Sequence, residues 1–310
     1  MSSLVRITNN LMFVRISVIL AAGFWGLFWI PIRALDEQGI SAAWATVLFH
    51  ALPFILMLPV AVWRWKKLVQ GGWILIVLGF FLGLAIALYA TAYLFSDVVR
   101  VLLLYYLLPV WATLLGRVML NEPITRPRMV AIALGLSGML AILGIGDGIP
   151  WPRNLGDWMA LAGGMLWAFG SVLTKDDETN GPVEITFCFF GFATAASLAL
   201  LLVPQLAGLT VPSMENIIAV MPWMIPVAIF LILPVIFVVI WGTGILDPGH
   251  IGILFLSEIS VGAIAAAIIT DEPFGLREMM GVLLITGAGL CEAVEHSFAA
   301  RRKKSQDAFD

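Results

Sequence analysis

The chain has 310 residues, of which 61% are hydrophobic and 12% charged, and its mean hydropathy is +1.01. These values lie well above those of soluble globular domains and are typical of an integral membrane protein. The net charge of −3 says little by itself, because the positions of Lys and Arg matter more than their sum in such proteins. We expect a lipid bilayer and a small molecule as partners, and no nucleic acid.

Stretches long enough to cross a bilayer follow one another along the chain. A membrane-spanning helix needs about 20 mostly apolar residues. Ten such stretches lie at residues 16–34, 42–63, 73–95, 98–120, 129–145, 157–174, 183–203, 222–243, 249–270 and 276–296. The connections are too short for a soluble domain, so we expect function to reside within an all-α bundle or at its two faces.

The distribution of Lys and Arg predicts the orientation of these spans. If both termini are cytoplasmic, thirteen Lys and Arg residues fall on the cytoplasmic side, including a basic tail, and four fall outside. The opposite orientation reverses this ratio. Because cytoplasmic loops carry the excess of positive charge, we expect ten transmembrane helices with both termini cytoplasmic.

Two stretches in the halves of the chain resemble each other. Residues 104–123 read LYYLLPVWATLLGRVMLNEP and residues 254–273 read LFLSEISVGAIAAAIITDEP, so a shift of 150 aligns Glu122 with Glu272. A fainter match pairs AAGFWGLFWIPIR with GGMLWAFGSVLTK and aligns Trp25 with Trp167. Both matches occur in the same order, which indicates an internal repeat.

An odd number of spans in each repeat has a topological consequence. Five spans in each copy require the second copy to enter the membrane upside down, as in many secondary transporters. We therefore expect one five-helix repeat over residues 1–150 and an inverted five-helix repeat over residues 151–310. Such proteins hold their substrate near the bilayer midplane, between the two repeats.

The motifs of these repeats, taken in order, resemble one transporter superfamily. FWG in the first span, LLPVWATLLGRVMLNEPIT with Pro109 in the fourth, and GDWMALAGGMLWAFGSVLTK in the sixth resemble the EamA-type drug/metabolite transporters. Within that superfamily the chain is most similar to bacterial amino acid exporters, including aromatic amino acid exporters. The resemblance implies a multi-pass protein of the bacterial inner membrane that exports small metabolites. One departure is that Glu258 and Ile259 stand where the second repeat would carry its proline.

Glu258 lies near the middle of the ninth span, directly after Ser257. An acid at this depth costs up to about 3 kcal/mol on insertion scales, and it usually faces a cavity or a partner. Three interpretations remain open: a partner for a substrate ammonium group, a proton-coupling site, or a protonated acid that only packs against a neighbouring helix. Ser257 and Glu258 are both candidate substrate-binding residues.

Aromatic residues form a second candidate group. Trp25 and Trp167 lie at mid-span and at equivalent repeat positions, whereas Tyr89 and Tyr93 share one face of the third span. Tyr105 lies in the outer part of the fourth span. Core packing accounts for each residue alone, but the group favours the lining of a central cavity.

His50 is the one histidine at mid-span, in the second predicted helix. A hydrogen bond to a neighbouring helix explains such a residue better than a proton relay with Glu258, although His50 remains a candidate site residue. Glu122 and Glu272 end their helices, with Arg126 or Arg277 as candidate ion-pair partners.

The missing motifs narrow the functional class. The chain has no G-x-x-x-x-G-K-[ST] for ATP and no H-E-x-x-H for zinc. No basic residue lies at mid-depth between Arg100 and Arg117, which disfavours phosphorylated substrates. We therefore expect no catalytic activity, no cofactor and no metal ion. The expected function is secondary transport of amino acids by alternating access, with efflux of lipophilic cations or a non-transporting scaffold or sensor as alternatives.

Overall fold

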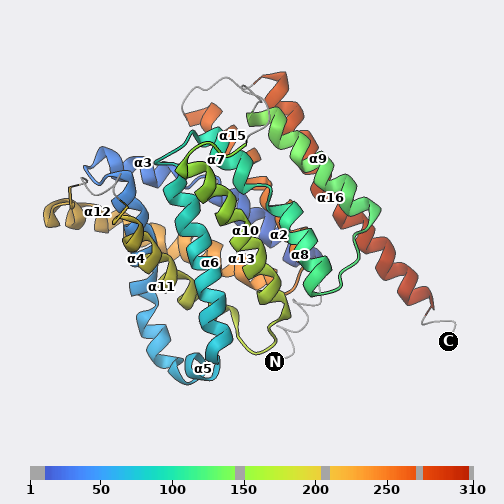
Figure 1. Cartoon of the computed structure of the whole chain (residues 1–310), viewed down its shortest axis with the longest axis horizontal. Coiled ribbons are helices and arrows are strands. Elements are labelled where there is room, and N and C mark those ends of the chain that lie inside the picture. Colours follow the sequence, from blue (N-terminus) through green and yellow to red (C-terminus); the bar gives the residue numbers. More distant parts are fainter. Residues whose placement is uncertain (1–10, 144–150, 204–209, 270–274, 307–310) are drawn as a thin grey trace.

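The computed structural model describes residues 11–143, 151–203, 210–269 and 275–306, with side chains described as far as residue 291. All regular elements in these ranges are helical (Figure 1). The helices are α2 (Leu11–Trp25), α3 (Trp29–Glu37), α4 (Ala42–Trp63), α5 (Trp65–Gln70), α6 (Gly72–Ala92), α7 (Val98–Tyr105), α8 (Leu108–Met119), α9 (Arg126–Leu143), α10 (Leu155–Asp176), α11 (Pro182–Leu200), α12 (Met214–Val227), the π-helical turn η1 (Ala228–Ile232), α13 (Leu233–Thr243), α14 (Pro248–Phe255), α15 (Ser257–Ile269) and α16 (Leu276–Gln306).

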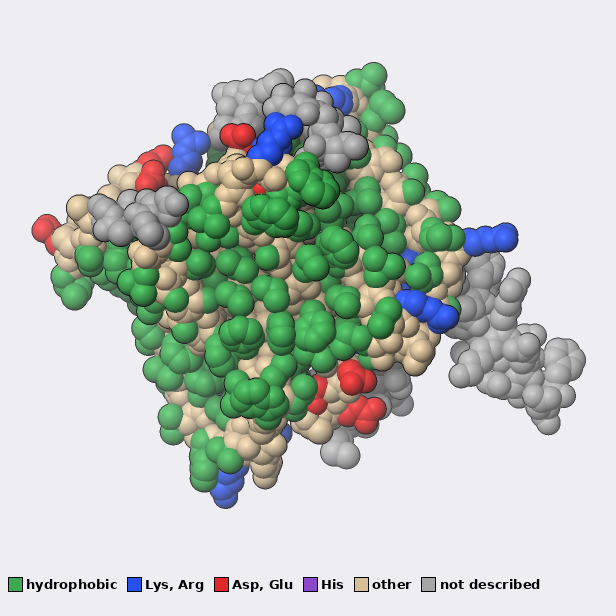
Figure 2. Space-filling view, in the orientation of Figure 1, with side chains coloured by type: hydrophobic (Ala, Val, Ile, Leu, Met, Phe, Trp, Pro, Cys, Tyr) green, Lys and Arg blue, Asp and Glu red, His purple; other side chains and the backbone are tan. Residues whose placement is uncertain are grey.

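Eight helices or successive helix pairs in the described residues are long and apolar enough to span a membrane. This confirms the prediction of a multi-pass, all-α membrane protein. Hydrophobic side chains cover most of the face shown in Figure 2, and the charged ones gather towards its edges. The sixth and tenth predicted spans correspond to α10 and α16, and the total of ten spans and the cytoplasmic termini remain predictions.

The composition of α10 explains why this helix is not among the eight. It has 22 residues and includes four glycines together with Asp157 and Lys175. More than half of its residues are buried, and it packs against α6 and α8 inside the bundle. A helix surrounded by protein does not need the continuous apolar surface that lipid contact requires.

Three of the predicted spans are interrupted. The first breaks between α2 and α3, the fourth between α7 and α8 at Tyr106, and the ninth between α14 and α15 at Leu256. Pro109 lies in the first turn of α8, where its missing N–H removes a helical hydrogen bond and favours a break. No proline accompanies the break at Leu256, where the Ser257 hydroxyl donates to the carbonyl of Leu254 over 2.8 Å.

The helix bounds repeat at the interval found in the sequence. α7 begins at Val98 and α14 at Pro248, whereas α9 begins at Arg126 and α16 at Leu276, each pair 150 residues apart. The breaks at Tyr106 and Leu256 are separated by the same interval. The expected boundary at residue 150 lies outside the described residues and remains a prediction.

The fourth and ninth spans are equivalent in the repeat, and they run in opposite directions where α8 crosses α14. Gly249 at the start of α14 packs against Thr113 in the middle of α8, whereas Gly252, further along α14, packs against Pro109 near the start of α8. A Cβ added at Gly252 would lie 2.8 Å from the Cα of Pro109, so glycine permits this close crossing. An antiparallel crossing of equivalent spans is the arrangement that inverted repeats require.

Candidate functional site

Glu258 is the second residue of α15, directly after the break at Leu256. Its carboxylate accepts a hydrogen bond from the hydroxyl of Tyr89 over 3.1 Å and a second, short one from the hydroxyl of Tyr106. The hydroxyl of Tyr93 donates in turn to that of Tyr89 over 2.6 Å. The membrane acid predicted from the sequence therefore lies at the end of a chain of phenol groups.

All four tyrosines of the chain surround this carboxylate. The ring of Tyr105 stacks on that of Tyr89, with centroids 3.9 Å apart and an interplanar angle of 28°. It also meets Tyr106 edge to face at 5.3 Å. The term tyrosine cluster denotes Tyr89, Tyr93, Tyr105 and Tyr106 below. The sequence analysis selected three of them and missed Tyr106, which follows Tyr105 directly and lies at the helix break.

The three helix breaks meet around Glu258. Gly26, in the break between α2 and α3, lies against the backbone of Glu258 and Gly262 in α15, where a side chain would not fit. The hydroxyl of Ser257 reaches the carbonyl of Ile19 in α2 over 3.1 Å. The N–H groups of Gly26, Tyr106 and Leu256 bond to carbonyls three or four residues earlier. The polar groups at this junction are therefore the side chains of Ser257 and Glu258 and the tyrosine hydroxyls, although it lies within apolar spans.

The structure places Trp167 beside the tyrosine cluster. In α10, Gly163 and Gly164 lie against Tyr105, one helical turn before Trp167. The buried ring of Trp167 meets Phe255, the last residue of α14, at a centroid distance of 5.9 Å. Its indole nitrogen has no hydrogen-bond partner among the described residues, which leaves a buried donor next to the break.

Trp25 occupies a different aromatic group. Its ring lies 4.1 Å from that of Phe28 and 6.5 Å from that of Phe49 in α4. It directly precedes Gly26 and is therefore close in sequence to the contact with α15. The ring contacts of Trp25 nevertheless link α2 to α4, while those of Trp167 link α10 to α14.

His50 is directed to another helix. Its Nδ1 lies 2.9 Å from the hydroxyl of Ser197 in α11, and both side chains are buried. The structure therefore gives His50 the interhelical hydrogen bond that the sequence analysis favoured, and the bond joins α4 to α11 rather than to Glu258.

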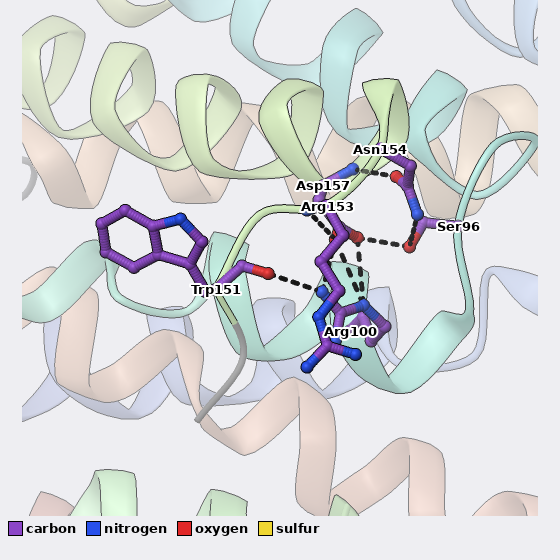
Figure 3. A network of polar contacts seen from close by, with 6 residues as sticks. All are labelled: Ser96, Arg100, Trp151, Arg153, Asn154 and Asp157. Atoms are coloured by element: carbon purple, nitrogen blue, oxygen red, sulfur yellow. Dashed lines mark hydrogen bonds and ion pairs between the residues drawn. The ribbon is translucent and has the colours of Figure 1, made fainter. Parts of the chain in front are cut away.

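A buried ion pair joins α7 to the start of α10 (Figure 3). The side chain of Asp157 is 0% exposed and accepts from Arg100 Nη2 at 2.5 Å, from the hydroxyl of Ser96 and from the backbone N–H of Arg153. Asn154 caps α10 by accepting from the N–H of Asp157 over 2.8 Å. We call this group the Asp157 clasp.

A second charged group joins the turn after α8 to α9 and to the start of α14. Arg128 Nη2 is 2.9 Å from Asp247, and Nη1 is 3.4 Å from Glu122. The ion-pair partner of Glu122 is therefore Arg128 and not Arg126 as expected, while Glu272 lies outside the described residues. Burial and then the charge of Asp247 raise the pKa of Glu122 to about 7, against the opposing effect of Arg128 and Lys175. We call Glu122, Arg128 and Asp247 the Glu122 clasp.

The described residues contain no group of three or more His, Cys, Asp or Glu side chains that could hold a metal ion. Cys188 and Cys291 are free thiols. The chemistry that the site offers is that of a carboxylate, phenol hydroxyls and aromatic rings. This combination suits an organic cation, a substrate ammonium group or a proton.

Comparisons with known proteins agree with the fold. A solved structure titled "Crystal structure of protein" has a TM-score of 0.69 over 95% of this chain and 98% of that chain, at 17% identity, which supports the fold alone. No curated protein matches. The model of the EamA-like transporter family matches residues 12–144 and again residues 154–291. The chain therefore belongs to the EamA-like transporter family and is a multi-pass membrane transporter of small molecules.

Proposed function

We propose that the chain is a secondary transporter that exports amino acids, in particular those with aromatic or hydrophobic side chains, across a bacterial inner membrane. In this proposal the halves alternate in exposing a site between them. The observation that carries the proposal is the carboxylate of Glu258, held by the hydroxyls of Tyr89 and Tyr106 where three broken helices meet.

The chemistry of this junction matches the amino group of an amino acid. An ammonium group can replace the phenol hydroxyls as the hydrogen-bond donor to Glu258, and a charge-assisted bond of this kind contributes about 1.5 to 3 kcal/mol. The rings of Tyr105 and Trp167 offer surfaces against which an apolar or aromatic side chain can pack. The family membership supports a small substrate, and the site favours one that combines a positive group with an apolar body.

A proton can occupy the same carboxylate. If substrate and proton compete for Glu258, release of one accompanies binding of the other, and the transporter exchanges them across the membrane. The tyrosine hydroxyls of Tyr89 and Tyr106 stabilise the carboxylate when neither is bound. Direct substrate recognition and proton coupling therefore predict different properties for the neutral variant.

The test is Glu258→Gln in proteoliposomes, measured by substrate affinity, by counterflow and by flux driven by a pH gradient. Substrate recognition predicts a loss of affinity of roughly 10 to 100-fold at every pH, the equivalent of the lost charge-assisted bond. Proton coupling predicts loss of gradient-driven flux while counterflow persists. Glu37→Gln, at a surface-exposed acid in α3, is the matched control. Wild-type values for Glu258→Gln in all three assays would overturn the proposed role of the site.

Efflux of lipophilic cations is the second candidate function. The observation that favours it is the tyrosine cluster around a single carboxylate, since aromatic faces attract cations. A panel of amino acids, organic cations and sugars, assayed with and without a pH gradient, separates the two. Binding of a panel compound without any flux would instead identify a scaffold or sensor.

A further inference from the structure

The two clasps lie at opposite ends of the bundle, and each joins the two segments that match the family model. Asp157 lies in the first turn of α10, whereas Lys175 near its last turn donates to the carbonyl of Ile245 over 2.5 Å, two residues before Asp247. The 22 residues of α10 span about 33 Å. Arg100 belongs to the first matched segment and Asp157 to the second, while Glu122 and Arg128 belong to the first and Asp247 to the second.

The clasps differ in how well their carboxylates are paired. In the Asp157 clasp one fully buried carboxylate receives donors from Ser96, Arg100 and Arg153. In the Glu122 clasp two carboxylates, with side chains 14% and 31% exposed, bond to the guanidinium of Arg128. Arg128 lies nearer to Asp247 than to Glu122, so Glu122 is the more weakly paired of the two acids.

The charges around Glu122 come from three packed elements. Asp247 approaches from the start of α14 and repels an ionised Glu122, while Arg128 in α9 and Lys175 in α10 attract it. Gly116 in α8 packs against the carboxylate of Glu122, where a Cβ would lie 3.0 Å from Oε2. Burial, and then the like charge of Asp247 across the two segments, oppose ionisation of Glu122 more strongly than Arg128 and Lys175 favour it.

We propose that Glu122 makes the Glu122 clasp sensitive to protons, so that its protonation holds this end of the bundle closed and its ionisation loosens it. The proposal rests on the Glu122 clasp and on the family match, and it does not depend on the substrate or on the role of Glu258. The Asp157 clasp, with its single well-paired carboxylate, provides the end of the bundle that does not respond in this way.

The direction of the pH effect follows from linkage. In the packed arrangement the pKa of Glu122 is raised from its ordinary value of 4.5 to about 7. An acid whose pKa is raised on packing penalises the packed state only when it is ionised. The stability of the closed end is thus unaffected below about pH 4.5, the ordinary pKa of Glu122. It falls as the pH rises from there through about 7.

The experiment measures access of water to Thr113, whose side chain is 5% exposed and packs against Gly249, just after Asp247. The full-length chain carries Cys188→Ala, Cys291→Ala and Thr113→Cys and is reconstituted in proteoliposomes. Labelling by N-ethylmaleimide is followed from pH 4.0 to 8.5 with and without Glu122→Gln. The readout is the labelling rate of the protein with Glu122 divided by that of Glu122→Gln at the same pH. An ionised Glu122 disfavours a nearby thiolate, so a rise in this ratio reports opening.

We expect this ratio to be near one at pH 4.0 and to rise roughly tenfold by pH 8.5. A tenfold change corresponds to a pKa shift of about one unit. We use this smaller shift because Glu122 and Asp247 are partly exposed, so that water and salt screen their repulsion. Asp247→Asn, which removes the repelling charge, is the second variant; it should make the rise smaller and complete it at a lower pH. A cysteine at Thr91, a buried residue near the Asp157 clasp, is the control and should show no rise.

Two results would overturn the proposal. A ratio that stays constant across the pH range at Thr113 means that ionisation of Glu122 does not open this end. An equal rise at Thr91 and Thr113 means that the whole bundle loosens and that the Glu122 clasp has no specific role. Either result leaves the Glu258 measurements unaffected, because no substrate is present.

Discussion

Asp157→Asn is the substitution whose effect on stability is best defined by the structure. It replaces a fully buried carboxylate by a neutral side chain of the same shape and leaves the guanidinium of Arg100, 14% exposed, without its charged partner. The backbone N–H of Arg153 can still donate to the amide oxygen of asparagine, and the amide NH2 group, in place of the other carboxylate oxygen, can donate to the hydroxyl of Ser96. The change therefore isolates the charge of the Asp157 clasp from its shape.

The expected loss is about 3 kcal/mol. Removing one partner of a buried ion pair costs about 3 to 5 kcal/mol, and the lower value applies because two of the hydrogen bonds survive. At this chain length about 1 kcal/mol corresponds to roughly 2 °C in melting temperature, so Asp157→Asn should melt about 6 °C below the wild type. Glu37→Gln removes the ion pair of Arg33 with Glu37, whose side chains are 64% and 68% exposed. This change should lower the melting temperature by less than about 2 °C.

Thermal unfolding of the purified protein in detergent measures both variants. Arg100→Gln and the double variant Arg100→Gln/Asp157→Asn complete a double-mutant cycle. If the cost of Asp157→Asn arises because the guanidinium of Arg100 has lost its carboxylate partner, the double variant should lose less stability than the sum of the two single variants. Melting of Asp157→Asn within 2 °C of the wild type, or strict additivity in the cycle, would refute the reasoning.

The remaining predictions concern the site, its neighbour and the topology. Tyr106→Phe removes one hydroxyl donor from Glu258 and keeps the ring contact with Tyr105, so unfolding in detergent should show a loss of about 1 kcal/mol or more. His50→Leu leaves the hydroxyl of Ser197 without its partner and should cost about 1 to 3 kcal/mol; a changed dependence of transport on the pH gradient would contradict its structural role. A reporter fused after residue 310 should be cytoplasmic and one within residues 146–156 external, and a periplasmic signal from the first would reject the predicted orientation.

The order of the helices could be predicted from the sequence because the length of an apolar run is a local property. Helix starts were predicted less well: the eighth span was expected from residue 222, whereas α12 begins at Met214. Ser213 caps that helix by accepting from the N–H of Asn216 over 3.1 Å. The extra residues include Glu215 and Asn216, whose polar side chains hid the first turns from a search for apolar runs.

The helix breaks and the hydrogen-bond partners of the site residues could not be predicted from the sequence, because they depend on tertiary contacts. Glu258 could be selected as a candidate site residue because an acid is unusual within an apolar run. Tyr89 and Tyr93 could be selected because their spacing puts them on one helical face. That Tyr89 and Tyr106 donate to Glu258 requires the relative positions of three helices, which one sequence does not contain. The role of Asp157 could not be predicted from the sequence, since charged residues are common at the ends of membrane spans.

The repeat explains why the site is asymmetric. The shift of 150 that relates the helix breaks places Leu108 opposite Glu258, and Phe255 and Leu256 opposite Tyr105 and Tyr106. Both halves thus provide a break, but the acid comes from the second half and the phenol groups from the first. A rearrangement that separates the halves at this level must break the hydrogen bonds between Glu258 and the tyrosines. A proton or an ammonium group on Glu258 replaces those bonds, and its binding therefore changes the free energy of separating the halves, as coupling of binding to conformational change requires.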